Sequence, residues 1–568
     1  MDIQRTLLII GLAVVSYLMI LEWQEDYGQN AKINAAVNNS QSYPQHDVTN
    51  PVSVSGIPEA VSVSEDIPVA QQDIVQPAEL DVVEVISTEL ISIETDVLSL
   101  KIDPVGGDIV SVGLIDYPVS VDQPDVPFQL LNRTAEHTYI AQSGLIGAKG
   151  TDKAGKPRPL YRSESLFYTL GDKETLIVDL SLTQEDGVKI TKRLTFTKGE
   201  YLVNMDVIVD NVSNEMWSAQ LFAQIKRDGS SDPGLDSSGF GLPTFLGGAY
   251  WDQDKPYNKK TFDDFVDEPL NKEIPGGWVA FIQHYFMSAW VPDQSMTLRY
   301  QTRTTPDHFI ISYMTPAVKV NAGDQYTFSN RFYAGPKILK KLEEIEPEKG
   351  LDLVVDYGPL FFISKPLYLL LNFYHSLVAN WGLAIILLTV TVKALFFPLS
   401  AASYRSMANM RRVTPKLTEI RERHADDRQK LSQEMMKLYK EEKINPLGGC
   451  LPVLIQMPVF LALYWALLES VELRQAPFFG WIHDLSVMDP YFVLPIIMAG
   501  SMFFQQMLNP APPDPMQAKM MKMMPLVFGV FFLFFPAGLV LYWVTNNLLS
   551  IAQQWHITRG IEKAAEAK

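Results

Sequence analysis

An apolar run from Trp381 to Leu399, interrupted by one lysine, constrains this chain more than any other stretch. Its nineteen residues would form a helix about 28 Å long, close to the hydrocarbon thickness of a bilayer, so the run predicts a transmembrane helix. Lys393 would then lie inside the membrane, where an ionisable side chain costs about 2.5 to 3.5 kcal/mol and usually marks a working site. Pro398 predicts that the helix ends about 7 to 8 Å beyond Lys393, so the competing interpretation is a lysine whose stem reaches the headgroups.

The 568 residues exceed the length of a single domain, and their charge is unevenly distributed. The net charge of −18 comes mainly from the region between Glu22 and Asp356, whereas residues 400–449 carry eleven Lys or Arg against seven Asp or Glu. A single cysteine, Cys450, excludes an intrachain disulfide. No Cys/His cluster or acid/base pair indicates a metal, cofactor or catalytic site, so we expect a protein that is not an enzyme and binds no cofactor.

The N-terminal region predicts an anchor followed by a tether. Arg5 precedes sixteen mostly apolar residues and then an acidic stretch, an order that places the N-terminus in the cytoplasm. A cleavable signal peptide is the alternative, but no small-x-small site follows the apolar run, which favours an uncleaved signal anchor over residues 1–23. Residues 24–90 are rich in Val, Ser, Gln, Pro and acid, a composition typical of a flexible acidic linker.

Alternation with a period of two begins in the next region. Residues 188–197 and 201–209 alternate apolar with polar side chains around a Lys-Gly-Glu turn, which predicts a long antiparallel hairpin with one buried face. Similar runs at 309–314 and 326–332 extend the pattern. We therefore expect a large antiparallel β-sandwich over residues 91–346, closed by a charged helix.

The C-terminal part predicts a connector and a helical core. An apolar and aromatic stretch at 360–378 indicates an amphipathic helix on the outer membrane surface, within a connector at 347–380. Residues 400–449 carry two sets of apolar residues at spacings of three and four, which predicts a cytoplasmic antiparallel helical hairpin, basic on its outside. The apolar run from Met523 to Ile557 is too long for one crossing, so we expect two spans joined by an outer turn at its central proline.

Together these features predict a multi-span α-helical membrane protein with six transmembrane helices and both termini in the cytoplasm. The signal anchor is one span, and the other five form a core over residues 381–568 that includes the hairpin. The five expected spans are 381–399, 451–471, 491–508, 520–535 and 539–557.

Polar side chains on these spans indicate a hydrophilic cavity inside the membrane. Lys393 shares a helix face with Thr389. Hydrogen bonding between helices would by itself account for the uncharged residues on the other spans. No second buried charge is available to pair with Lys393, whereas a pump usually needs a chain of ionisable groups, so ion transport is disfavoured. One cation with several neutral partners suits a polar or acidic guest that is held transiently.

Six passages are the most distinctive of the chain: NPLGGC at 445–450, LIQMPVFLAL at 454–463, VELRQAP at 471–477, WIHDL at 481–485, DPM at 514–516 and FPAGLVLY at 535–542. In this order they resemble the YidC membrane protein insertases of Gram-negative bacteria, relatives of the mitochondrial and chloroplast insertases. The resemblance covers the whole chain. It implies that the β-sandwich is periplasmic and that the five C-terminal spans enclose a hydrophilic groove, open to the cytoplasm and to lipid and closed toward the periplasm.

The resemblance also assigns individual residues. Lys393 matches a groove cation that is commonly arginine in enterobacterial members, and lysine keeps the charge but lacks the planar fork that binds carboxylates. Trp543 stands where relatives often carry tyrosine, and Met457 and Pro458 match positions that line the substrate path. The expected groove residues are Lys393, Thr389, Gln456, Met457, Pro458, Ser501, Gln505, Tyr542, Trp543, Thr545 and Asn546.

By this resemblance the protein resides in the inner membrane and inserts and helps fold membrane proteins, alone or with the SecYEG translocon and accessory Sec proteins. Implied clients are nascent or newly made membrane proteins such as ATP synthase subunit c and small phage coat proteins. The basic hairpin offers a contact for the ribosome or for membrane lipids, and we expect no DNA partner. Two rival hypotheses stay open: a secondary transporter or channel for a small solute, and a sugar-binding or sugar-converting β-sandwich.

Overall fold

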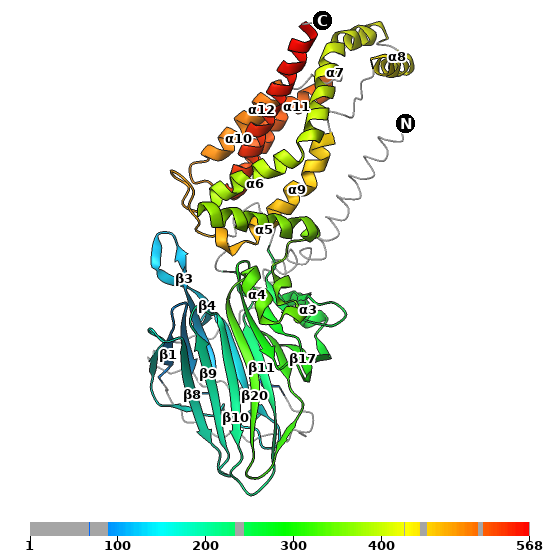
Figure 1. Ribbon diagram of the computed structural model, residues 1–568. Helices are drawn as coiled ribbons and strands as arrows, with labels where there is room; N and C mark the ends of the chain where they lie inside the picture. The colour runs from blue at the N-terminus through cyan, green and yellow to red at the C-terminus, as the bar shows by residue number, and fades with distance from the viewer. Residues whose placement is uncertain are drawn as a thin grey trace, which may run out of the picture.

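The computed structural model describes residues 67–68, 89–232, 244–424, 427–442, 451–508 and 515–566. The signal anchor expected at 1–23, most of the linker expected at 24–90 and the NPLGGC passage lie outside these residues. Figure 1 shows two bodies, a β-sandwich and a layer of helices above it, with the C-terminus at the far end of the helical layer.

Two sheets form the β-sandwich. The larger sheet runs in the order β14 (Asn271–Pro275), β17 (Thr297–Thr304), β18 (Phe309–Met314), β11 (Trp217–Arg227), β5 (Thr138–Ile146), β4 (Gln123–Arg133), β3 (Asp108–Ser120), β2 (Leu98–Asp103), β1 (Ile91–Glu94) and β7 (Phe167–Thr169), and β19 (Val318–Val320) pairs with β11. The smaller sheet runs β13 (Asn258–Lys260), β12 (Gly247–Tyr250), β15 (Val279–Ile282), β16 (Phe286–Pro292), β20 (Gln325–Pro336), β10 (Leu202–Asp210), β9 (Lys189–Thr197), β8 (Thr175–Thr183) and β6 (Arg162–Ser163). Apolar side chains of both sheets, with those of the short helices α3 (Phe262–Asp267) and α4 (Leu339–Ile345), meet in one core.

The hairpin predicted from the alternation is formed by β9 and β10. Asn204 lies opposite Thr195 and Asp210 opposite Lys189, and the apolar residues of both strands face the core. The pairing is antiparallel except at one edge, where β1 and β7 run parallel. The expectation of a wholly antiparallel sandwich is wrong there, because a parallel neighbour needs a long crossover, which local alternation does not reveal.

The helical layer contains α5 (Phe361–Val378), α6 (Trp381–Leu395), α7 (Phe397–Arg423), α8 (Arg428–Glu441), α9 (Leu451–Leu468), α10 (Val493–Met507), α11 (Pro515–Phe531) and α12 (Ala537–Glu566). Apolar side chains of α5, α6, α9, α10 and α12 share a second core. The long apolar run does divide into two helices, because α11 and a 3-10 turn at Phe532–Phe534 end before Pro536 and α12 begins after it. The helices expected at 451–471, 491–508, 520–535 and 539–557 are present with shifted ends.

The span expected at 381–399 is not one straight helix. α6 ends at Leu395, and the first part of α7 is bent away from it by 67°. Pro398 explains the break, because proline cannot donate to the carbonyl four residues earlier and fits the first turn of a new helix. No single helix of the described residues is long and apolar enough to cross a membrane, whereas the bent pair Trp381–Leu395 and Phe397–Met410 passes by length and composition.

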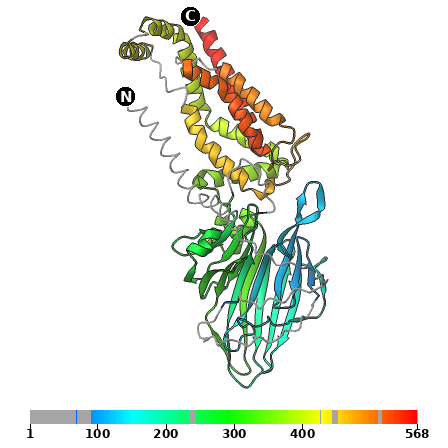
Figure 2. The same cartoon turned by 180° about the vertical axis from the view of Figure 1, so that it is seen from behind.

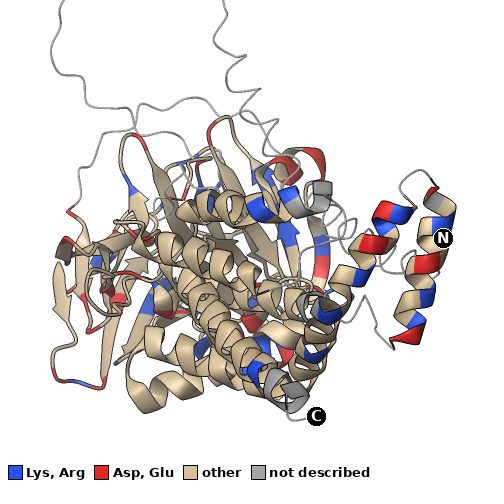
Figure 3. Cartoon of the chain, turned by 90° about the horizontal axis from the view of Figure 1, so that it is seen from above, with Lys and Arg blue, Asp and Glu red and all other residues tan. Residues whose placement is uncertain are grey.

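The hairpin expected at 400–449 is formed by the far part of α7 and by α8. Val413 and Leu417 of α7 pack against Leu438 of α8, as the apolar spacing predicts. Asp427 caps α8 by accepting a hydrogen bond from the Lys430 N–H at 3.0 Å. Figure 3 shows acidic residues beside basic ones on both helices, while residues 400–449 as a whole carry eleven Lys or Arg against seven Asp or Glu.

Buried polar contacts join the two bodies. Lys337, directly after β20, forms a 2.6 Å ion pair with Glu469 at the end of α9, and their side chains are 3% and 8% exposed. The Nε2–H group of His284 donates to the Leu468 carbonyl at 2.8 Å. Arg474 donates to the Pro118 carbonyl at 2.8 Å, near the tip of the β3–β4 hairpin that reaches toward the helices in Figures 1 and 2. The sandwich is therefore held against the helical layer at several points.

Candidate functional site

The predicted cation lies between helices. Lys393 and Thr389 are one turn apart on α6 and are 3% and 1% exposed. Thr389 donates within its own helix to the Ile385 carbonyl at 2.7 Å. The Lys393 ammonium instead reaches α12, where it donates to the Ser550 hydroxyl at 2.6 Å. Its charge is therefore held inside the helical layer.

A polar face of α12 continues from Lys393 toward α10. Ser550 donates to the Asn546 carbonyl at 2.7 Å. The Asn547 amide donates to the Ser501 hydroxyl of α10 at 3.1 Å, and all these side chains are at least nine-tenths buried. We call Lys393, Ser501, Asn546, Asn547 and Ser550 the Lys393 cluster, which links α6, α12 and α10 through hydrogen bonds.

Helix α7 adds buried hydroxyls beside this cluster. Ser400, Ser403 and Tyr404 are 2%, 3% and 6% exposed, and the Tyr404 hydroxyl lies against Ser550. The Ser403 hydroxyl is buried without a hydrogen-bond partner among the described residues. Tyr404 therefore joins α7 to the cluster through Ser550, and Ser403 on the same helix keeps an unused hydroxyl.

The other expected groove residues are not joined to the cluster. Tyr542 is buried, and Trp543 is half-buried with its ring 4.8 Å from that of Phe460. Three further predicted residues, Gln456, Gln505 and Thr545, are half-buried, and Met457 and Pro458 are exposed on α9. Met457 and Pro458 therefore face away from the packed interior.

Sequence reasoning missed part of the polar face of α12. The spacing in the sequence predicts a semi-polar stripe along Tyr542, Thr545, Asn546, Leu549 and Gln553. Of these, Tyr542 and Asn546 are buried, but Thr545, Leu549 and Gln553 are only half-buried, whereas Asn547, Ser550 and Gln554 are 2% to 3% exposed. The two sets differ by one or two positions, and each residue turns a helix by about 100°. Asn547, Ser550 and Gln554 also recur at spacings of three and four, so the sequence is compatible with either polar stripe. Only the burial in the structure shows which of the two faces the interior.

Backbone contacts tie the start of α12 to the loop before α10. The Ala537 and Gly538 N–H groups at the start of α12 donate to the carbonyls of Val487 and Leu485 at 2.7 and 2.9 Å. Those carbonyls belong to the loop that joins α9 to α10. These bonds hold the start of α12 against that loop.

The cluster offers a cation and neutral donors and acceptors for a polar guest. Among the described residues Lys393 forms no ion pair, and its hydrogen-bond partner is the uncharged Ser550. The described part of the chain holds no group of three or more His, Cys, Asp or Glu side chains placed for a metal ion. The site is suited to transient binding of a carboxylate or a backbone carbonyl.

Two family models match the chain. The model of the 60Kd inner membrane protein matches residues 373–564, which contain the Lys393 cluster. The model of the YidC periplasmic domain matches residues 90–370, which contain the sandwich.

Full-length relatives and solved structures are also similar to the chain. A membrane protein insertase YidC of Pseudomonas aeruginosa (strain ATCC 15692) is 51% identical over 591 aligned residues, with 100% of both chains covered. That of Pseudomonas putida (strain GB-1) is 53% identical over 573 residues, covering 100% of this chain and 99% of the relative. A crystal structure of an active YidC insertase with its first transmembrane domain resolved is 18% identical with a TM-score of 0.37, covering 82% of this chain and 92% of the other. A putative aldose 1-epimerase from Escherichia coli K12 is 9% identical with a TM-score of 0.28, covering 43% of this chain and 98% of the other.

Proposed function

The chain belongs to the YidC family of membrane protein insertases, and from that premise we propose how it receives the polar part of a client. The protein inserts membrane proteins and is not an enzyme. We propose that the Lys393 cluster is the place where the translocated polar end of the client enters the helical layer. The observation that carries this proposal is a buried cation that is hydrogen-bonded to a neutral hydroxyl in an otherwise apolar layer.

Exchange of hydrogen-bond partners is the first step of the proposed mechanism. A carboxylate of the client replaces Ser550 as the partner of the Lys393 ammonium. The new hydrogen bond joins two opposite charges, so in a site of low polarity it is stronger than the bond to the neutral hydroxyl. Ser550 retains the Asn546 carbonyl as its own partner, so it loses little when Lys393 turns to the client. When the tail moves on, Lys393 returns to Ser550, and no nucleotide is needed.

Two general forces complete the insertion in this proposal. The membrane potential contributes about 2.3 kcal/mol per elementary charge per 100 mV. Burial of the apolar segment of the client contributes about 25 cal/mol per Å² of apolar surface. Exposed Met457 and the exposed Phe503 and Met507 of α10 supply an adaptable apolar surface for that segment.

Topology and partners are part of the same proposal. Six spans with both termini in the cytoplasm place the sandwich in the periplasm and the α7–α8 hairpin in the cytoplasm, in agreement with the distribution of Lys and Arg. We propose ATP synthase subunit c and small phage coat proteins as clients of the protein alone, and SecYEG as its partner for larger ones. The hairpin is proposed to contact the ribosome through basic side chains, which outnumber the acidic ones over residues 400–449.

The proposal differs from solute transport in what it expects of Lys393. A coupled transporter needs an acid that exchanges protons or ions with the cation. Lys393 has no such partner among the described residues. Purified protein in vesicles should insert a small phage coat protein without any flux of a small solute.

The test is a series of Lys393 variants with clients whose translocated tails carry acidic or neutral residues. Lys393→Arg should retain insertion, Lys393→Ala should reduce insertion of acidic tails several-fold, and Lys393→Glu should be worst because it repels them. Insertion of clients with neutral tails should depend least on the side chain at position 393. Protease protection of the tail in each background measures insertion.

Lys365→Ala is the matched control, because Lys365 pairs with Glu343 near the sandwich and lies outside the cluster. Lys365→Ala should leave unchanged the ratio between insertion of clients with acidic tails and insertion of clients with neutral tails. If Lys393→Ala inserts both kinds of tail at the wild-type level, the ammonium serves only to anchor the helix, and the proposed role of the cluster is wrong.

A further inference from the structure

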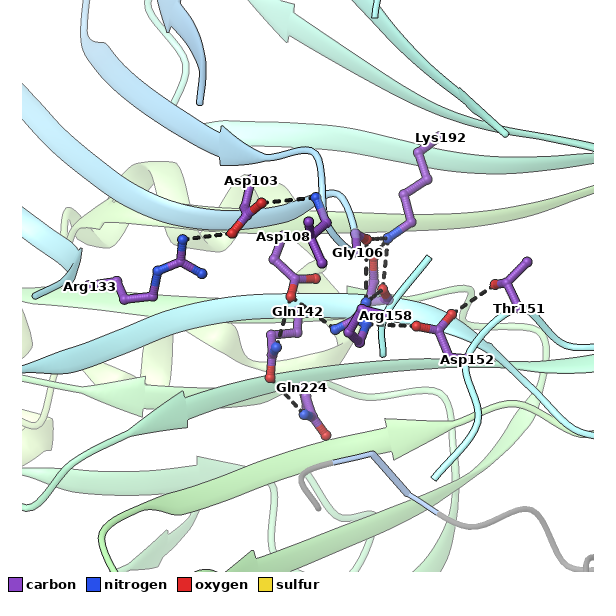
Figure 4. A network of polar contacts seen from close by, with 12 residues as sticks. Asp103, Gly106, Asp108, Arg133, Gln142, Thr151, Asp152, Arg158, Lys192 and Gln224 are labelled. Carbon is purple, nitrogen blue, oxygen red and sulfur yellow. Dashed lines mark hydrogen bonds and ion pairs between the residues drawn. The ribbon is translucent and has the colours of Figure 1, made fainter. Parts of the chain in front are cut away.

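A network of buried charges lies in the sandwich, far from the Lys393 cluster. Figure 4 shows Arg158 reaching Asp108 and Asp152, with ion-pair distances of 2.9 and 2.7 Å. All three side chains are less than one-tenth exposed. The guanidinium carbon of Arg158 lies 5.7 Å from the centre of the Phe222 ring, so the network fixes a cation against that ring.

Phe222 belongs to an apolar patch on the outer face of the larger sheet. Its direct partner across β11 and β18 is Met314, and Ile146 of β5 lies diagonally opposite. These three side chains point away from the sandwich core, because their neighbours Leu221, Tyr313 and Leu145 belong to that core. They are nevertheless only 0% to 4% exposed. Something outside the sheet therefore covers the patch.

Arg158 covers part of the Phe222 ring, and a further part of the cover comes from the segment that the sequence predicts as linker. Ile67 is 3% exposed and belongs to the same apolar cluster as Ile146, Phe222 and Met314. Pro68 is buried as well. The two residues precede β1 by more than twenty positions and pair with no strand, so they reach the patch as an external segment.

We propose that Ile146, Phe222 and Met314 form a docking site for the Ile67-Pro68 pair of the same chain. A β-branched side chain fills the apolar patch, and the following proline favours an extended Ile67 and removes a donor that would need a partner there. Gly144, opposite Phe222 on β5, leaves room for the Asp152 carboxyl group and the Phe222 ring, since a Cβ there would lie 2.6 Å from Cγ of Asp152 and 2.8 Å from the ring. The linker is thus attached to the sandwich at Ile67 and Pro68.

Cysteine accessibility tests this docking in the full-length protein. In a Cys450→Ser background, Ile67→Cys provides a single thiol in the linker, and Ile177→Cys on β8, at a side chain that is 53% exposed, provides a single exposed thiol for a hydrophilic maleimide added from the periplasmic side. The thiol at position 67 should react about tenfold more slowly than the thiol at position 177, because reaction requires the docked segment to open. Met314→Asp should remove this difference.

The reverse experiment reports from the docking site. With Met314→Cys as the only thiol, Ile67→Asp should accelerate labelling about tenfold, whereas the matched change Ile177→Asp on the other sheet should have no effect. Trypsin resistance of the sandwich in each variant verifies that its fold is retained. Equal reactivity of the thiols at positions 67 and 177, or labelling at position 314 that does not respond to Ile67→Asp, would overturn the proposal.

Discussion

Alternate residues of β9 face the core of the sandwich, and Lys192 is the charged residue among them. Its side chain is completely buried. Its ammonium donates to the carbonyls of Gly106 and Ser143 at 2.6 and 2.7 Å and to the Ser143 hydroxyl at 3.0 Å. Burial, with a further contribution from nearby Arg158, lowers the pKa of Lys192 to about 8. Because the unfolded chain has the higher pKa, it binds the proton more tightly than the folded protein does.

Lys192→Met should therefore change how stability depends on pH. The wild-type free energy of unfolding should rise between pH 7 and pH 9.5 by about 2 kcal/mol more than that of the variant, because the cost of burying the ammonium disappears as it loses its proton. Urea unfolding of the protein in detergent, followed by tryptophan fluorescence, measures the difference. Lys189→Met, which removes an exposed lysine of the same strand, is the control and should behave as wild type. Parallel curves for Lys192→Met and wild type would contradict the prediction.

At the scale of elements, the contact between α6 and the loop after α9 decides how closely that loop packs on the helices. Gly382 lies in the first turn of α6, and a Cβ at this position would lie 2.6 Å from Cγ of Phe478 in that loop. The same loop supplies the carbonyls that receive the first N–H groups of α12. A small residue at position 382 is therefore needed for the loop to close over the helices.

Gly382→Ala should loosen this closure. The added methyl group has to displace Phe478, at a cost of about 1 to 3 kcal/mol for overpacking. We expect a lower melting temperature and faster maleimide labelling of a thiol introduced by Ser486→Cys. Gly500→Ala is the matched control, since a Cβ there meets nothing within 4 Å and alanine favours a helix by about 0.5 to 1 kcal/mol. Unchanged labelling at position 486 in Gly382→Ala would show that Phe478 is not part of the closure.

At the scale of the whole molecule, docking of the sandwich on the helical layer should weaken in acid. His284 donates to the Leu468 carbonyl, and burial, together with the nearby Lys337, lowers the pKa of His284 to about 3. The folded state therefore binds the proton less tightly than the unfolded chain, so stability is full above about pH 6.5 and falls as the pH drops toward 3.

Between pH 7.5 and pH 5, the wild type should lose about 2 kcal/mol more stability than His284→Gln, which keeps a donor for Leu468 but has no proton to gain. Chemical unfolding of the full-length protein at both pH values provides the measurement. His137→Gln, at a side chain that is 60% exposed, should lose as much as wild type. An equal loss in His284→Gln would mean that this histidine does not sense acid at the contact.

The sandwich itself should be an accessory to insertion, because the Lys393 cluster draws on helices alone. Removing residues 91–337 while keeping α5, with Glu469→Gln to neutralise the carboxylate that loses Lys337, should leave complementation of a depleted strain largely intact. Lys393→Glu in the same truncated protein should abolish growth and serves as the control. Loss of growth with the truncated protein still present in the membrane would refute the accessory role.

Local periodicity determined the elements of this protein, and long-range packing decided how they are used. The β9–β10 hairpin, the division at Pro536 and the α7–α8 pair follow from spacing and turn residues, which act over a few positions and can be read from one sequence. The stripe of α12 that meets Lys393, the parallel edge at β7 and the docking of Ile67 depend on contacts between residues far apart in the chain. Sequence patterns identify amphipathic faces, but a face contributes free energy of burial only when another element of the fold covers it and removes it from water.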